Sequence, residues 1–593
     1  MNARYGAVRR RRRTVVNLRT PLRMSLVALV IAALLAVPAL ALELETAQSV
    51  RSTQGVVTAA HPLAAAAGAE ILAKGGNAVD AAIATAYALA VVEPHASNLG
   101  GEGYMVISLA DGTEVAIDYR SRAPLHVNVH TPAETGWPPH GILTTLIPGM
   151  VKGTELALQK YGTMTLAEVL EPAIRLAEEG FPMGDLLASQ IADAYESFLL
   201  EYPEAGKVFL DNMLIPEPGT IFRNPDLAHA MRLIAEHGSD VFYFGEIADA
   251  IEQATEGWVD KASLAAYRAY ERDVVRGTYR GYEIVTAPPI VSGVRVVETL
   301  NILELFDLAQ YGHPNHPTAA HIMAEALKIT QADYNAYVWD PNFYRVPVEG
   351  LTSKLYARER AALISLDEAK RYEAGDPYAI SPAGEVAFTP ATVEESPSTT
   401  HVSVLDKDGN AVALTQTISS FWGSRIVVPG YGFLLSNHFR QFPGFEVDDP
   451  FRPDYAAPLK TTRTVLAPTI LKKDGEVRLV IGSPGAARIP QTVVQTIVSI
   501  VDFGMDLETA IRTPKFHVSG LTLNLEGGWP AESAEALAAL GHRVNTNYGE
   551  LDLFFGGLNI IAVEDDGTMI GVGSFRRDGG ASAPLVVEEA VVH

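Results

Sequence analysis

The sequence of 593 residues contains no cysteine. The chain therefore forms no disulfide, binds no metal through thiolates, carries no lipid-modified cysteine and uses no cysteine nucleophile. Basic residues are also scarce, because 46 Lys and Arg stand against 70 Asp and Glu and give a net charge of −24. An acidic protein repels nucleic acid, so we expect no nucleic-acid partner.

The first 41 residues differ in composition from the rest of the chain. They hold eight arginines and no acidic residue, and an apolar run from Ser25 to Ala41 ends in Ala39-Leu40-Ala41. A basic stretch, an apolar stretch and a small-residue cleavage pattern are typical of a secretory signal. We therefore predict that residues 1–41 export the chain to the periplasm or the cell exterior. The alternative is an uncleaved N-terminal membrane anchor.

The pattern after Ala41 predicts alternating helical and strand-rich parts. Two Ala-rich helices are expected between residues 62 and 92, then a hairpin over 104–119 and a mainly helical part over 144–374. The polar, proline-containing stretch 376–398 is typical of an exposed tail. Strands are expected from Thr399 onward, including one near 424–435. Strands from both ends of the chain with helices between them indicate an α/β (α+β) fold of stacked layers.

The sequence Pro397-Ser398-Thr399-Thr400-His401 lies where the polar tail meets the first of these later strands. A cut before Thr399 would place a hydroxyl nucleophile and a free α-amine base on one residue. The α-amine titrates near about 7.7–8.0, which suits a general base at neutral pH. Without such a cut, these residues only begin a β-strand.

Several short blocks, each weak alone, occur in an order and spacing that resemble one family along nearly the whole chain after residue 41. These blocks are His61-Pro62-Leu63, Gly75-Gly76-Asn77-Ala78-Val79-Asp80-Ala81-Ala82, Val92-Glu93-Pro94-His95, Leu99-Gly100-Gly101, Asp118-Tyr119-Arg120, Thr399-Thr400-His401, Asp408-Gly409-Asn410-Ala411-Val412 and Gly482-Ser483-Pro484-Gly485. The sequence thus resembles the gamma-glutamyltransferase (glutathione hydrolase) family of N-terminal-nucleophile hydrolases.

The resemblance implies an αββα sandwich and self-cleavage between Ser398 and Thr399. Residues 42–398 would form a large subunit and residues 399–593 a small catalytic one, paired as a heterodimer, with Thr399 as nucleophile. It implies an amide substrate, water or an amino acid or peptide as acceptor, and neither a metal nor a cofactor.

Three further residues take catalytic roles by the same resemblance. Thr417 falls where the family keeps a threonine that hydrogen-bonds the nucleophile, and the Asp408-Gly409 turn would bring its strand beside Thr399. Gly485 and Ala486 fall in the oxyanion loop, although the family usually has glycine at the second position. The alternatives are a structural strand threonine and an ordinary turn.

The positions that would grip the substrate depart from the family pattern. Arg120 matches the arginine that binds a glutamyl α-carboxylate. Thr464 keeps one hydroxyl of a serine pair, and Ser419 stands in place of an asparagine. His438 and Gln441 fall where acid or amide side chains face the α-ammonium.

These departures predict a pocket without an acid for the ammonium, and therefore a substrate amide that bears a carboxylate but no free α-amine. A loop residue such as Asp448 or Asp449 is the other source of that charge. The function expected is a mainly hydrolytic amidohydrolase. A true glutathione hydrolase or transpeptidase and an unprocessed, catalytically silent binding protein are the alternatives.

Overall fold

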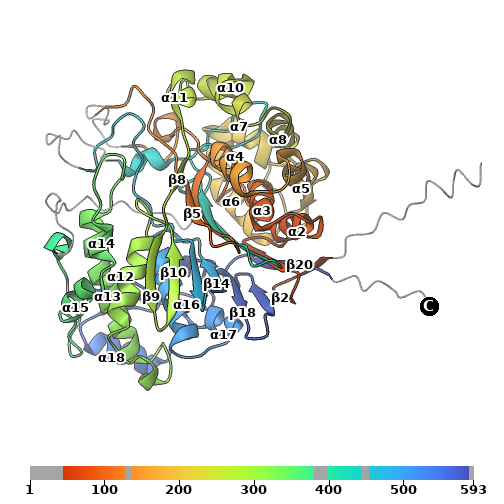
Figure 1. Ribbon diagram of the computed structural model, residues 1–593. Coiled ribbons are helices and arrows are strands. Elements are labelled where there is room, and N and C mark those ends of the chain that lie inside the picture. The colour runs from red at the N-terminus through yellow and green to blue at the C-terminus, as the bar shows by residue number, and fades with distance from the viewer. Residues whose placement is uncertain (1–43, 129–136, 380–397, 443–452, 586–593) are drawn as a thin grey trace, which may run out of the picture. The chain divides into compact units, whose positions relative to one another are not determined.

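The computed structural model describes residues 44–128, 137–379, 398–442 and 453–585 (Figure 1). The predicted signal segment 1–41, most of the polar tail before Ser398, and Asp448 and Asp449 lie outside these residues. No helix within the described ranges is long and apolar enough to cross a membrane.

Two antiparallel sheets form the centre of the described structure. The first has eight strands in the order β1 (Leu44–Ala47), β20 (Gly580–Pro584), β3 (Gly55–Ala59), β11 (Thr400–Asp406), β12 (Ala411–Thr417), β4 (Glu102–Ser108), β5 (Glu114–Tyr119) and β8 (Tyr270–Arg272). The second has seven in the order β2 (Ser49–Ser52), β19 (Met569–Val572), β18 (Asn559–Val563), β14 (Glu476–Gly482), β13 (Thr469–Lys473), β10 (Tyr282–Thr286) and β9 (Val275–Tyr279). Segments from both proposed subunits therefore interleave in each sheet.

The described structure has two large hydrophobic cores, one on each face of the eight-stranded sheet, and successive side chains of β11 and β12 point alternately into one and the other. Val404 and Val412 point into the core shared with helices α2 (Pro62–Ala73) and α3 (Ala78–Val92). Ala411 and Ala413 point into the other core, with β13 and β14 and with helices α12 (Gly293–Leu303), α13 (Pro317–Tyr337) and α16 (Ile489–Val501). Period-two alternation is what strands buried on both faces require. The predicted αββα stacking is confirmed, and Figure 1 shows the two helical groups on opposite sides of the strands.

Helices α2 and α3 begin and end close to where the sequence signals predict. Pro62 occupies the first turn of α2 after the His61 cap, and the chain turns at Gly75 with a φ of +93°. Asn77 and Asp80 form a capping box at the start of α3, whose 15 residues are all buried. Thus α3 is a rigid base beneath β11 and β12.

The middle of the chain is mainly helical, as predicted. Its longer helices are α4 (Met150–Tyr161), α5 (Leu166–Glu179), α6 (Asp185–Leu200), α7 (Pro203–Phe209), α8 (Pro225–His237), α10 (Glu246–Ala254), α12, α13 and α15 (Lys354–Ala361). The prediction missed β8, β9 and β10, although β9 and β10 pair as a hairpin around an Arg280-Gly281 turn. The strand predicted near 424–435 is wrong, because only two isolated bridges form there, one between Val427 and Leu434 and one between Leu435 and Gly100.

The strands β11, β12, β13, β14, β18 and β19 agree with the strands expected after Thr399. The same part also contains α17 (Leu507–Arg512), α18 (Ala531–Ala539) and a small sheet of β15 (Phe516–Ser519), β16 (Thr522–Leu525) and β17 (Arg543–Asn545), and the prediction missed α17 and this sheet.

Candidate active site

The Ser398–Thr399 peptide lies at the start of β11, in a nearly closed environment. Thr399 is only 5 % exposed, and its φ is +92°. A β-branched residue with positive φ is strained by about 1–3 kcal/mol, so the surrounding contacts must hold it there. Strain of this kind gathers at functional positions.

Thr417 lies beside the hydroxyl of Thr399, as predicted. The Thr399 Oγ1 hydroxyl donates to Thr417 Oγ1 at 3.2 Å, and Thr417 Oγ1 also accepts from the Ser419 N–H at 2.9 Å. The register of β11 on β12, with Thr400 opposite Gln416, fixes this approach. The arrangement leaves the Thr399 oxygen free to use its lone pairs toward a carbonyl carbon.

The loop after β14 reaches the carbonyl of Ser398. The Gly485 N–H donates to Ser398 O at 3.2 Å. Gly485 has a φ of +127°, and a Cβ there would stand 2.8 Å from Gly556 Cα, so both conformation and space require glycine. Ala486 follows with a φ of +52° and begins the 3₁₀ turn Ala486–Arg488 that leads into α16. Alanine thus adopts the left-handed conformation where the family usually has glycine.

Arg120 is completely buried and already holds a carboxylate. Its guanidinium pairs with Glu102, and its Nη2 donates to Thr462 O at 3.1 Å. Glu102 opens β4 directly opposite Thr417 on β12, which places the two side chains on the same face of the sheet. The Arg120–Glu102 pair therefore belongs to the surroundings of the nucleophile.

His438 contacts the same carboxylate. Its Nδ1 lies 2.5 Å from Glu102 Oε1. Burial, reinforced by Arg120 and Arg440, holds the pKa of His438 well below its usual range, so the imidazole is neutral. The expectation that no acid faces Arg120 and His438 is therefore wrong, because Glu102 lies between them.

The other predicted substrate-binding residues, Gln441, Ser419 and Thr464, lie in different surroundings. Gln441 ends the 3₁₀ turn that His438 begins and is half-buried. Ser419, with a φ of +82°, accepts a hydrogen bond from the Ser398 hydroxyl through its carbonyl and so adjoins the Ser398–Thr399 peptide. Thr464 is buried, with its carbonyl accepting from Tyr334, whereas Thr462 is the threonine that contacts Arg120.

Known proteins are similar to this chain in sequence and in architecture. The family model described as gamma-glutamyltranspeptidase matches residues 64–584. The chain belongs to the gamma-glutamyltranspeptidase family. It is 38% identical over 543 residues to "Acylase ACY 1 proenzyme" of Pseudomonas sp. (strain SE83), covering 89% of this chain and 93% of that protein. It is also 38% identical over 547 residues to "Glutathione hydrolase proenzyme" of Escherichia coli (strain K12), covering 89% of this chain and 91% of that protein.

A solved structure agrees with this family membership. The crystal structure of cephalosporin acylase from Bacillus halodurans superposes with a TM-score of 0.81 at 30% identity and covers 90% of this chain and 96% of that one. The chain is thus an enzyme of the gamma-glutamyltranspeptidase family with an N-terminal-nucleophile hydrolase fold. Because relatives named acylase and glutathione hydrolase are equally similar, the family alone does not decide the acyl group.

Sequence reasoning missed two residues that touch this site. Glu102 was visible inside the glycine cluster Gly100-Gly101-Glu102-Gly103. Arg577 donates through Nη1 to the carbonyl oxygen of Thr399 at 3.1 Å, from the far end of the chain. The sequence signal for Glu102 was an acidic residue among glycines at the start of a buried strand. No local sequence pattern marked Arg577.

One buried cluster among the described residues has the spacing of metal ligands. It consists of His321, Glu325 and His542. His321 Nδ1 and His542 Nε2 are 2.9 Å apart, as in a hydrogen bond, and Lys328 Nζ lies 2.5 Å from Glu325 Oε1. Because Lys328 already supplies the positive charge that Glu325 needs, this cluster is explained as a structural network on α13.

Proposed function

We propose that the chain cleaves itself between Ser398 and Thr399 and then hydrolyses gamma-glutamyl-type amides through an acyl-enzyme on Thr399. The observation that carries this proposal is the convergence of two hydrogen bonds on one peptide. Thr417 accepts from the Thr399 hydroxyl, and the Gly485 N–H donates to the Ser398 carbonyl. A nucleophile and an oxyanion donor thus meet at the same carbonyl group.

Self-cleavage would begin when Thr399 Oγ1 attacks the carbonyl carbon of Ser398. The hydroxyl proton is passed to the Thr399 amide nitrogen, which is the leaving group, and the Gly485 N–H stabilises the negative oxygen of the tetrahedral intermediate. The carbon–nitrogen bond then breaks as the Thr399 nitrogen departs with this proton, which leaves an ester. Water hydrolyses the ester, which releases the Ser398 carboxylate and restores the Thr399 hydroxyl beside its free α-amine.

Turnover would repeat this chemistry on a substrate. The α-amine of Thr399 accepts the hydroxyl proton while Oγ1 attacks the substrate amide, and the amine leaving group takes that proton as it departs. Water then attacks the acyl-enzyme, or an amino acid or peptide does so and receives the acyl group. Each step uses groups of the chain, the substrate and water.

A denaturing gel with an amide assay tests the proposal. The wild-type chain should give two polypeptides and release p-nitroaniline from γ-glutamyl-p-nitroanilide. Thr399→Ala should remain one chain without turnover, whereas Thr399→Ser, which keeps a hydroxyl, should still be cleaved. Cleavage or turnover by Thr399→Ala would remove Thr399 from its role. A wild-type chain that stays whole would favour the silent binding protein.

The acyl group depends on the charges around Arg120. Arg120 and Glu102 cancel each other, and His438 is neutral. An acyl group with a carboxylate alone, such as glutaryl, would bring a second carboxylate to this buried site and no ammonium to match Glu102. A γ-glutamyl group carries a carboxylate for Arg120 and an ammonium for Glu102, so it adds no net charge. Glu102 thus favours the γ-glutamyl group over the amine-free substrates expected from the sequence.

Two p-nitroanilides decide between these acyl groups. With γ-glutamyl favoured, Glu102→Gln should lower kcat/KM for γ-glutamyl-p-nitroanilide by about 10–100-fold, the rate equivalent of about 1.4–2.7 kcal/mol. The same change should leave glutaryl-p-nitroanilide unchanged or improve it. A wild-type preference for the glutaryl compound would instead support the amine-free substrate class.

A further inference from the structure

Arg577 holds the nucleophile's backbone through the carbonyl oxygen of Thr399. Its side chain is fully buried, and Nη1 donates to Thr399 O at 3.1 Å. The same nitrogen lies 3.6 Å from Glu93 Oε1, and the guanidinium faces the Phe421 ring at 5.9 Å. Arg577 follows β19 and precedes β20, while Glu93 ends α3, so the contact joins the two ends of the chain.

We propose that Arg577, anchored by Glu93, is a positioning residue that keeps Thr399 in the backbone conformation needed for attack on Ser398. This inference rests on the proposed self-cleavage and names the contact that holds the Ser398–Thr399 peptide in the conformation for it.

The carbonyl oxygens of Ser398 and Thr399 each accept a hydrogen bond. Gly485 binds Ser398 O, and Arg577 binds Thr399 O. Between them, Thr399 keeps a φ of +92°, which a threonine leaves when it is free to relax. Releasing either carbonyl would let the residue turn toward negative φ and carry its hydroxyl away from the Ser398 carbonyl. A misplacement of about 1 Å costs roughly 100-fold in rate.

Glu93 is the acid that keeps Arg577 in place. The carboxyl is buried, and burial raises its pKa to about 7 against the opposing effects of Arg577 and the Thr400 hydroxyl. An uncompensated guanidinium at this depth would be costly, so the pair is needed to retain Arg577 in the core.

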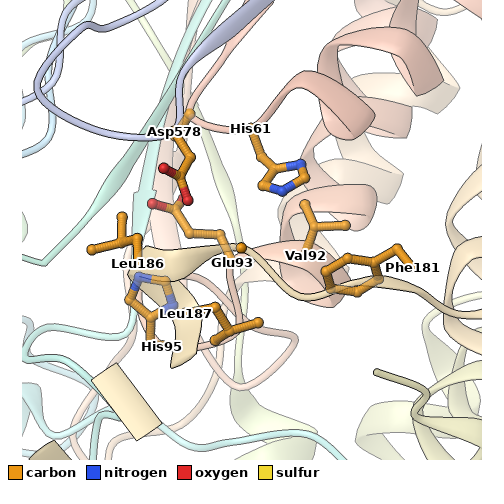
Figure 2. Close-up of a pocket in the computed structure, with 10 residues that line it drawn as sticks. His61, Val92, Glu93, His95, Phe181, Leu186, Leu187 and Asp578 are labelled. Atoms are coloured by element: carbon orange, nitrogen blue, oxygen red, sulfur yellow. The ribbon is translucent and has the colours of Figure 1, made fainter. Parts of the chain in front are cut away.

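The other titratable groups near Glu93 line a small cavity, about 10 Å³ in volume and so close to the size of one water (Figure 2). Figure 2 shows the carboxyl groups of Glu93 and Asp578 turned toward each other, with His61 and His95 on either side. Burial lowers the pKa of His61 to about 4 and that of His95 to about 3, so both are neutral. Burial and then Asp185 raise the pKa of Asp578. Arg577 is therefore the cation that faces Glu93.

The sign of the pH effect follows from this arrangement. Above pH about 7 Glu93 is ionised and holds Arg577; as pH falls through about 7 it takes up a proton and the ion pair is lost. Self-cleavage should therefore slow below pH about 7 in the wild-type chain, and Glu93→Gln should be slow at every pH without this step.

Cell-free translation of the whole chain, followed by a time course on denaturing gels at several pH values, measures the cleavage directly. We expect Arg577→Gln to slow cleavage by about 10–100-fold and Arg577→Lys, which keeps the charge, by less. Arg576→Lys is the matched control, because the adjacent, equally buried Arg576 bonds Glu526, Ile511 and Thr513 instead. It should be cleaved close to the wild-type rate.

Wild-type cleavage by folded Arg577→Gln, or equal slowing by Arg576→Lys, would overturn the proposal. Should Arg577→Gln fail to fold, Glu93→Gln decides, because an unchanged rate and pH profile would refute the anchoring role. Failure of the wild-type chain itself to be cleaved would instead refute the proposed function.

Discussion

Replacing Gly485 with alanine would test the oxyanion donor without removing a polar group. The added Cβ would stand 2.8 Å from Gly556 Cα, a backbone atom that cannot swing aside. At a φ of +127°, alanine is also strained whatever the space around it. The loop must therefore shift, and the Gly485 N–H moves with it.

The size of the effect follows from what that N–H does. It lies 3.2 Å from Ser398 O, at the upper end of a useful hydrogen bond, so a small displacement breaks the contact. Loss of one oxyanion donor costs about 10²–10³ in rate, or about 2.7–4 kcal/mol of transition-state stabilisation. We therefore expect Gly485→Ala to accumulate as an uncleaved chain over times at which the wild-type chain is fully cleaved.

The cleavage time course on denaturing gels is the assay, with thermal unfolding measured in parallel. Gly475→Ala is the control, because Gly475 also has a positive φ, +84°, but no heavy atom lies within 4 Å of its added Cβ. The Gly475→Ala control should lower the free energy of unfolding by about 1–2 kcal/mol and be cleaved normally. A folded Gly485→Ala chain that is cleaved at the wild-type rate would refute the role given to this N–H.

Two further changes probe the surroundings of Thr399 and the base beneath it. Thr417→Val removes the oxygen that accepts from the Thr399 hydroxyl at 3.2 Å, and self-cleavage should slow about fivefold, the effect of one hydrogen bond of about 1 kcal/mol. An unchanged rate would make Thr417 a structural strand residue. Asn77→Ala removes the cap that accepts from the Val79 and Asp80 N–H groups, and should lower the free energy of unfolding by about 1 kcal/mol in urea while cleavage remains unchanged. Slower cleavage at full stability would contradict a purely structural role for this cap.

The nucleophile's hairpin and the oxyanion loop could be predicted because their signals are local. The Asp408-Gly409 turn sets the pairing of β11 with β12, which brings Thr417 beside Thr399. Gly485 was marked by its own short motif, and its positive φ explains why glycine stands there.

The charges of the pocket could not be predicted in the same way. Glu102 meets Arg120 across the β4–β5 hairpin, but it reaches the nucleophile only because β4 also pairs with β12, some three hundred residues away in the chain. Arg577 reaches Thr399 through a return of the C-terminal strand to the same sheet. Contacts of this kind depend on strand order, which the sequence alone left open.

The most direct test of the central claim is the intact mass and N-terminal sequence of the small polypeptide in purified wild-type protein. We expect a fragment that begins with Thr399, and its absence in Thr399→Ala. A small fragment that begins at another residue, or an active chain that remains whole, would contradict the claim.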